Sequence, residues 1–116
     1  MPNVKEIYKQ LYSQRLDDPI FKNELDKDHN PSGGYSIGIG FIINWQEGPI
    51  KEFGRNGAMI EPIIETIINR LEFFQDSKFR CEQNENALIH LKMALGYLNE
   101  RTKEREDREV EGTYKI

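Results

Sequence analysis

The feature that most constrains this chain is a leucine stripe near its C-terminal end. The stripe steps alternately by three and four residues through Leu88, Leu91, Leu95 and Leu98. This spacing predicts an amphipathic helix from about Glu82 to Arg105. At the same spacing, the stripe continues backwards onto Asn84 and forwards onto Thr102 and Arg105. Polar groups on a core-facing seam are unfavourable unless they find hydrogen-bond partners. We therefore expect them to meet either another chain or a polar, anionic ligand at the end of the helices.

The composition favours a single globular domain that assembles with copies of itself. The chain has 116 residues, of which 37% are hydrophobic and 31% are charged, and one domain of this length is usual. A long helical hairpin leaves apolar surface that one chain does not cover, so an oligomer is expected. The formal net charge of −4 disfavours binding to DNA or RNA, although a local cationic patch can still hold a small phosphate ligand.

The cysteine content and the N-terminus predict a cytoplasmic protein. The chain has one cysteine, Cys81, which cannot form an internal disulfide and so fits a reducing compartment. The first residues lack the apolar core of a signal peptide. No apolar run is long enough to span a membrane, so no membrane partner is expected.

The N-terminal half predicts a helix, a turn and a strand. Apolar residues at helical spacing predict a short amphipathic helix over about residues 3–15, and the segment 30–34 predicts a turn. Residues 35–46 alternate between large apolar side chains and mostly small or polar ones, which predicts one strand. Its partner is either the segment around residues 20–25 or a strand of another subunit.

A second long helix precedes the leucine stripe. It is predicted to begin between Asn56 and Glu61, with Asn56 as a candidate N-cap, and to end between Gln75 and Lys78. Its apolar stripe consists of Ile60, Ile64, Ile67, Leu71 and Phe74, and Ile63 and Ile68 widen it.

The predicted fold class is α+β, with an N-terminal β-strand or β-hairpin region followed by a long antiparallel two-helix hairpin in an oligomer. Residues 1–116 are expected to form a single domain. It would comprise an N-terminal extension (1–34), a strand and loop (35–57) and a helical hairpin with a C-terminal tail (58–116).

The sequence offers no convincing catalytic, cofactor-binding or metal-binding set. The glycine-rich segment 33–40 lacks the spacing of a dinucleotide fingerprint and the lysine of a P-loop, so it is interpreted as part of a strand. Neither His29 nor His90 is spaced to join the glutamates of the first long helix into a metal site. No histidine is spaced to act as a base for Cys81.

Arginines near the end of the second helix carry the sharper hypothesis. Arg101 and Arg105 lie one turn apart on one face, and two guanidiniums so placed can hold a pyrophosphate by bidentate hydrogen bonds. The alternative is a solvated helix end, in which these arginines pair with neighbouring glutamates. Of the aromatic residues near the helix ends, Phe74 is the one expected to stack on a nucleobase, because it sits at the turn facing Asn84.

Five motifs in order carry a family resemblance. They read NWQEGPIKEFGRNGA (44–58), RLEFFQ (70–75), FRCEQNENA (79–87), LNERTKER (98–105) and VEGTY (110–114). Together they resemble the phage helical-hairpin domain shared by the Thoeris anti-defence and anti-CBASS nucleotide sponges. The resemblance covers roughly residue 44 to the C-terminus.

The resemblance implies a phage-made, non-enzymatic sponge that acts in the host cytoplasm, forms a symmetric oligomer such as a hexamer, and binds a cyclic nucleotide alarm. The strand before the hairpin is more similar to the Thoeris-directed branch, which implies glycocyclic ADP-ribose as the ligand. The implied roles are base stacking for Phe74, a hydrogen bond for Asn84 and pyrophosphate binding for Arg101 and Arg105. The implied pocket lining consists of Asn56, Gly112 and Thr113. Trp45, an aromatic residue near the strand-to-helix junction that could stack on a nucleobase, is a further candidate for ligand binding.

Two departures from the family pattern fall at the end of the chain. Tyr114 stands where a histidine is expected, and Glu106–Glu109 stands where a glycine is common. Three interpretations remain at this point. The chain is a sponge for glycocyclic ADP-ribose or for the cyclic di- or trinucleotides of CBASS, a purely structural helical hairpin, or an enzyme that hydrolyses the signal.

Overall fold

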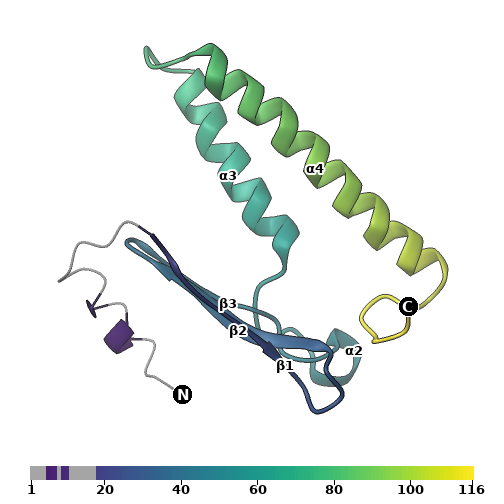
Figure 1. Ribbon diagram of the computed structural model, residues 1–116. Coiled ribbons are helices and arrows are strands. Elements are labelled where there is room, and N and C mark those ends of the chain that lie inside the picture. The colour runs from purple at the N-terminus through teal and green to yellow at the C-terminus, as the bar shows by residue number, and fades with distance from the viewer. Residues whose placement is uncertain (1–4, 8, 11–17) are drawn as a thin grey trace. The chain divides into compact units, whose positions relative to one another are not determined.

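The computed structural model describes residues 5–7, 9–10 and 18–116, and it confirms the α+β class (Figure 1). The chain clusters into two compact units. Of the described residues, those up to residue 58 and residues 112–114 form the sheet unit, and residues 59–111 and 115–116 form the hairpin unit. The predicted start of the helical hairpin at residue 58 thus lies next to the division between units, while the single-domain organisation stays a prediction.

The sheet unit is built on three antiparallel strands in the order β1-β2-β3. They are β1 (Ile20–Leu25), β2 (Pro31–Gly38) and β3 (Phe41–Asn44). Strand β1 pairs with β2 over its whole length, with a register shift between Asn23 and Leu25. The partner of the predicted strand is therefore the segment 20–25 of the same chain.

The prediction of one strand over residues 35–46 is wrong, because the chain reverses at Ile39 and Gly40. Gly40 has a φ of +90°, which a glycine adopts without steric penalty. The two-residue turn pairs Ile37 with Ile42 and Gly38 with Phe41, so the odd-numbered residues change face there. The alternation in sequence hides this change. A side chain at Gly38 would collide with the ring of Phe41, which explains the glycine.

The first hairpin turn also lies earlier than predicted. Residues 31–34 belong to β2, and the reversal is made by residues 26–30. The Asp26 carboxylate accepts hydrogen bonds from the backbone N–H groups of Asp28 at 2.8 Å and Asn30 at 3.0 Å. An aspartate that binds its own backbone in this way stabilises a turn, and His29 there has a φ of +64°.

The core of the sheet unit is centred on β2. Ile37 is fully buried and Tyr35 is 6% exposed, and Ile7 and Ile20 pack against them. Residues 5–7 and 9–10 are helical, in agreement with part of the helix predicted over residues 3–15. The rest of that helix lies outside the described residues.

A short helix, α2 (Ile50–Phe53), follows the sheet and was not predicted. The loop after it contains Asn56, whose side chain does not cap a helix as predicted. The N-cap of the next helix is Met59, which makes no side-chain capping bond. Asn56 instead binds the backbone of Glu47, so it fixes a loop in the sheet unit.

The hairpin unit consists of α3 (Ile60–Gln75) and α4 (Glu82–Asp107), which run antiparallel side by side (Figure 1). The seam predicted for α4 is confirmed, since its seven positions from Asn84 to Arg105 are all buried or half-buried. In the part of the chain that the structure describes, no helix is long and apolar enough to cross a membrane.

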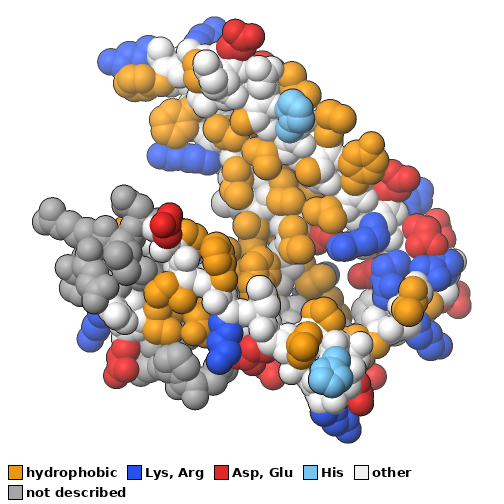
Figure 2. Space-filling model, viewed as in Figure 1, with side chains coloured by type: hydrophobic (Ala, Val, Ile, Leu, Met, Phe, Trp, Pro, Cys, Tyr) orange, Lys and Arg blue, Asp and Glu red, His pale blue; other side chains and the backbone are white. Residues whose placement is uncertain are grey.

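The face of α3 that is least exposed differs from the predicted apolar stripe. The positions with least exposure are Glu61, Ile63, Ile64, Ile68, Leu71 and Gln75. Ile60, Ile67 and Phe74 remain exposed, in successive steps of seven residues. Helix α3 therefore has two apolar stripes, and α4 covers only one of them. Figure 2 shows apolar side chains along the exposed surface of the hairpin. The exposed large apolar residues of α4 are Ile89, Met93 and Tyr97.

Helix α4 ends in a Schellman motif without the usual glycine. The Val110 N–H donates to the Arg105 carbonyl and the Glu109 N–H donates to the Glu106 carbonyl, both at 2.9 Å. These are the two bonds that define the motif. Its left-handed position is occupied by Glu109, with a φ of +61°. The absent glycine noted in the sequence therefore leaves the turn intact but strained.

We predict that Glu109→Gly stabilises the protein by about 0.5–1 kcal/mol, because glycine avoids the steric penalty of the left-handed conformation. Glu106→Gly is the matched control, and it should destabilise by about 1 kcal/mol because Glu106 lies within the helix. Urea unfolding measures both effects. Equal destabilisation by the two variants would show that Glu109 is not held in this conformation.

Candidate functional site

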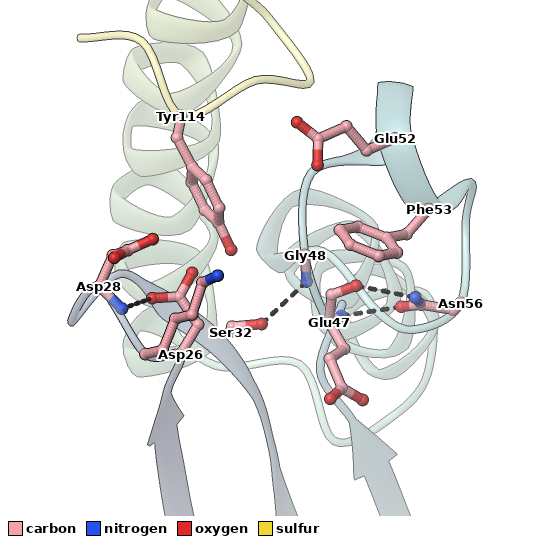
Figure 3. Close-up of a pocket in the computed structure, with 10 residues that line it drawn as sticks. Asp26, Asp28, Ser32, Glu47, Gly48, Glu52, Phe53, Asn56 and Tyr114 are labelled. Carbon is pink, nitrogen blue, oxygen red and sulfur yellow. Dashed lines mark hydrogen bonds between the residues drawn. The ribbon is translucent and has the colours of Figure 1, made fainter.

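The sheet unit contains an open cavity of about 680 Å³ (Figure 3). Three segments of the unit surround it: the β1–β2 turn, the segment from Glu47 to Asn56 and the tail tyrosine. Its lining residues are Asp26, Lys27, Asp28, Ser32, Glu47, Gly48, Glu52, Phe53, Asn56 and Tyr114.

Hydrogen bonds from two amide side chains shape the loop beside this cavity. The Asn56 side chain accepts from the Glu47 N–H and donates to the Glu47 carbonyl, both at 2.8 Å. The Gln46 side chain donates to the Gly54 carbonyl at 2.8 Å and accepts from the Asn56 N–H at 3.0 Å. Asn56 thus lines the cavity, but its amide already supports the loop.

The tail residue Tyr114 reaches into the same cavity. Its ring points toward the β1–β2 turn (Figure 3), and its hydroxyl interacts with the side chains of Asp26 and Ser32. Backbone N–H groups, first that of Asn30, and the Tyr114 hydroxyl hold the pKa of Asp26 below its ordinary value. Partial desolvation and the nearby Asp26 raise the pKa of Tyr114. The tail tyrosine therefore interacts with the Asp26 carboxylate at the cavity.

The charge of the cavity is unfavourable for phosphate. Asp26, Asp28, Glu47 and Glu52 contribute carboxylates to its lining, against the single ammonium of Lys27. Carboxylates repel a phosphate group but accept hydrogen bonds from sugar hydroxyls and base amino groups. This cavity suits the sugar or base of a nucleotide better than its phosphates.

The hairpin unit carries two predicted residues at its turn end. Phe74, at the end of α3, is 37% exposed, and the Arg70 guanidinium carbon lies 5.2 Å from the centroids of the Phe73 and Phe74 rings. Asn84 lies in the first turn of α4 and is half-buried. Within the described residues its side-chain amide has no hydrogen-bond partner. This end therefore offers an accessible ring and an unused amide.

The opposite end of the hairpin carries the two predicted arginines. Arg101 donates from Nη2 to Glu61 Oε1 at 3.1 Å, and its side chain is 55% exposed. The Arg105 side chain is 20% exposed and binds the tail through Glu111, Val110 and Lys115. The alternative interpretation from the sequence was a solvated helix end in which these arginines pair with neighbouring glutamates. Both arginines do pair with a glutamate, but the partners are Glu61 and Glu111 rather than neighbours within α4.

One chain does not bring these two groups together. Asn84 and Arg101 belong to one continuous helix, and at about 1.5 Å per residue they lie about 25 Å apart along its axis. Phe74 is at the same end as Asn84, because α3 and α4 run antiparallel. A nucleotide of the size of ADP-ribose does not span this distance.

The remaining predicted residues belong to the sheet unit. Trp45 is half-buried, and its backbone N–H donates to the Gly34 carbonyl at 3.0 Å. Gly112, with a φ of +78°, accepts a hydrogen bond from the Lys51 N–H at 3.1 Å. Thr113 is half-buried beside it. None of the three lines the cavity, which takes only Asn56 from the predicted set.

Sequence reasoning missed Arg70 and the acidic cavity. The signal for Arg70 was present, since Arg70, Phe73 and Phe74 are spaced so that they share one helix face. The cavity had no such signal, because its carboxylates come from two segments that are about twenty residues apart in the sequence. Among the described residues, no group of three or more histidine, cysteine, aspartate or glutamate side chains is arranged to hold a metal ion.

Two comparisons with known proteins bear on this chain. The sequence profile described as "Acb2/Tad1, hairpin domain" matches residues 38–103, which is more than half of the chain. A relative from Bacillus phage SBSphiJ7, Thoeris anti-defense 1, is 50% identical over 72 residues. That match covers 62% of this chain and 51% of the relative, so the chain spans about half the length of the curated protein that it matches.

We predict that Tyr114→Phe raises the pKa of Asp26 toward its ordinary value, because the variant loses a hydrogen bond to the carboxylate. The folded pKa lies below the unfolded one, so the charged form stabilises the fold at neutral pH. That contribution is lost as the pH falls through the folded value. NMR titration of the carboxyl carbon measures the shift, with Tyr97→Phe on the hairpin as control. An unchanged Asp26 pKa would show that the tail tyrosine does not dock there.

Proposed function

Because the chain belongs to the Acb2/Tad1 hairpin-domain family, we propose that it is an anti-defence sponge, which binds and sequesters a cyclic nucleotide immune signal without cleaving it. The resemblance to Thoeris anti-defense 1 favours glycocyclic ADP-ribose as the signal. The alternatives are a sponge for the cyclic di- or trinucleotides of CBASS and a purely structural hairpin. We place its action in the cytoplasm of the infected host.

The observation that carries the proposal is that the accessible ring of Phe74 and the half-buried Asn84, whose amide has no hydrogen-bond partner among the described residues, lie at the same end of the hairpin. The Asn84 amide is not among the buried polar atoms that lack a partner, so it remains accessible to a ligand or to another chain. An accessible aromatic ring can stack on a base, which contributes about 1–3 kcal/mol per base, and a free amide at the same end can bind the edge of a base.

The pyrophosphate is assigned to Arg101 and Arg105. Both guanidiniums carry a fixed charge and can form bidentate bonds to phosphate oxygens. The carboxylate-lined cavity of the sheet unit is the wrong environment for phosphate. We propose that the sugar and base face Asn56, Gly112 and Thr113, which the family resemblance adds to the lining, and the aromatic candidate Trp45.

A complete site requires more than one copy of the chain. The stacking end and the arginine end of one hairpin are about 25 Å apart, so we propose that Phe74 and Asn84 of one protomer meet the arginines of another. The exposed stripe formed by Ile60, Ile67 and Phe74 supplies apolar surface for this association. The oligomer is proposed to be larger than a dimer, and a hexamer by resemblance.

In this arrangement the protein sequesters the signal by binding it and does not change it chemically. Stacking, burial and charge-assisted hydrogen bonds hold the signal, and no nucleophile, base or metal takes part. An abundant protein with slow release lowers the free signal by mass action.

Release by heating tests the proposal. The protein is incubated with glycocyclic ADP-ribose, unbound nucleotide is removed by filtration, and the retained protein is denatured at high temperature. We expect mass spectrometry to find the intact signal in the released fraction. Recovery of a hydrolysed product would identify an enzyme, and recovery of no nucleotide would favour the structural alternative.

Two variants localise the uptake in the same assay. Arg101→Ala should retain no signal and should unfold at nearly the wild-type temperature, because an exposed ion pair contributes roughly 0–1 kcal/mol. Lys103→Ala removes the same charge from an exposed position in the same region of α4 and should retain the signal. Equal loss in both variants would mean that net charge, rather than a defined clamp, is responsible.

A further inference from the structure

The guanidinium of Arg105 is already occupied by the C-terminal tail. Its Nε donates to Glu111 Oε2 at 2.9 Å, its Nη1 to the Lys115 carbonyl at 2.8 Å and its Nη2 to the Val110 carbonyl at 2.9 Å. A guanidinium binds a phosphate in bidentate fashion along one of two edges, Nε with one Nη, or both Nη groups. The three tail acceptors engage all three nitrogens, so neither edge is free of the tail.

Arg101 presents a different situation. Its one ion pair uses only Nη2, and most of its side chain is exposed. An incoming phosphate can approach Arg101 without breaking that pair. At Arg105, by contrast, the carboxylate of Glu111 stands where a phosphate oxygen would bind, and the Glu111 side chain is 29% exposed, so it can move into solvent.

We propose that Glu111 is an anion built into the signal site, which competes with the ligand phosphate for Arg105 and thereby sets the affinity. This inference rests on the proposed function. In the absence of signal, Glu111 satisfies the guanidinium and holds the tail. When the signal binds, a phosphate takes the place of the carboxylate, and the tail segment from Val110 to Lys115 rearranges around the ligand.

The competition has a measurable consequence. The apparent affinity equals the intrinsic affinity multiplied by the fraction of protein in which Arg105 is available. Glu111→Gln keeps the shape of the side chain but removes its charge, so it weakens the hold on Arg105 and raises that fraction. The expected gain in affinity is about two- to fivefold, the size of one partly exposed ion pair.

Glu104→Gln is a matched control. Glu104 lies on the same end of α4 and is paired with Arg108, so the variant removes the same charge and one ion pair. If Glu111 acts only through the net charge of this region, both variants tighten binding equally. If Glu111 competes directly at Arg105, only Glu111→Gln does so.

Calorimetry with glycocyclic ADP-ribose on the wild type and both variants tests the inference, after thermal unfolding has confirmed that each is folded. Tighter binding by Glu111→Gln alone supports it. Equal or weaker binding by Glu111→Gln, while the wild type binds, overturns the inference and leaves the proposed function standing. A wild type that binds no signal overturns both.

Hydrogen exchange of the wild type gives a second measurement that does not depend on a variant. The backbone N–H of Val110 is hydrogen-bonded to the Arg105 carbonyl, and its tail neighbours are held by the Arg105 side chain. Saturation with glycocyclic ADP-ribose should change the exchange of residues 110–115 and leave that of the β1–β2 pairing unchanged. Unaltered exchange of the tail would contradict displacement of Glu111.

Discussion

The rigid length of α4 governs what this chain can do. Its seam is apolar in the middle and polar at both ends, with Asn84 at one end and Thr102 and Arg105 at the other. A continuous helix holds these ends about 25 Å apart, and α3 packs along it without bringing them closer. The groups suited to a base and those suited to phosphates therefore cannot serve one small ligand within one chain. The separation makes assembly a requirement of the proposed site.

Charge places a second limit on the site. The chain is acidic overall, with a net charge of −4, and the cavity of its sheet unit is lined mainly by carboxylates. The two arginines proposed for the pyrophosphate lie near the end of α4, and each already has a carboxylate partner. An anionic ligand must exchange with these partners or share the arginines with them. The affinity of the site for the ligand therefore depends on how strongly Glu61 and Glu111 compete with the ligand phosphates for the two arginines.

The sequence predicted the helical elements well and the turns poorly. The seam of α4 was predictable residue by residue, because a continuous 3.6-residue period determines which side chains face a neighbour. The strand over residues 35–46 was mispredicted since a two-residue turn changes the face of the sheet without interrupting the alternation. For α3, two overlapping apolar stripes are present, and nothing in the sequence says which one α4 covers.

The candidate site was predictable only where it depends on one helix. Arg101 and Arg105 follow from their spacing, but the pairing of Arg105 with the tail depends on a left-handed Glu109, which the sequence disfavours. The loop role of Asn56 was also hidden, because its partner Glu47 is nine residues away. Long-range hydrogen bonds of this kind leave no periodic signal.

The claim that one site is shared between protomers is tested most directly by mixing two defective variants. Phe74→Ala should weaken the binding of glycocyclic ADP-ribose by about 1–3 kcal/mol, and Arg101→Ala should abolish tight binding, so neither variant alone should bind with wild-type affinity. When the two proteins are unfolded together and reassembled, some sites combine the intact Phe74 of one chain with the intact Arg101 of the other. About a quarter of the sites should then bind the signal if the two chain types assemble at random into a symmetric oligomer. No recovery of binding in the mixed oligomer, with assembly verified by native mass spectrometry, would contradict the shared site.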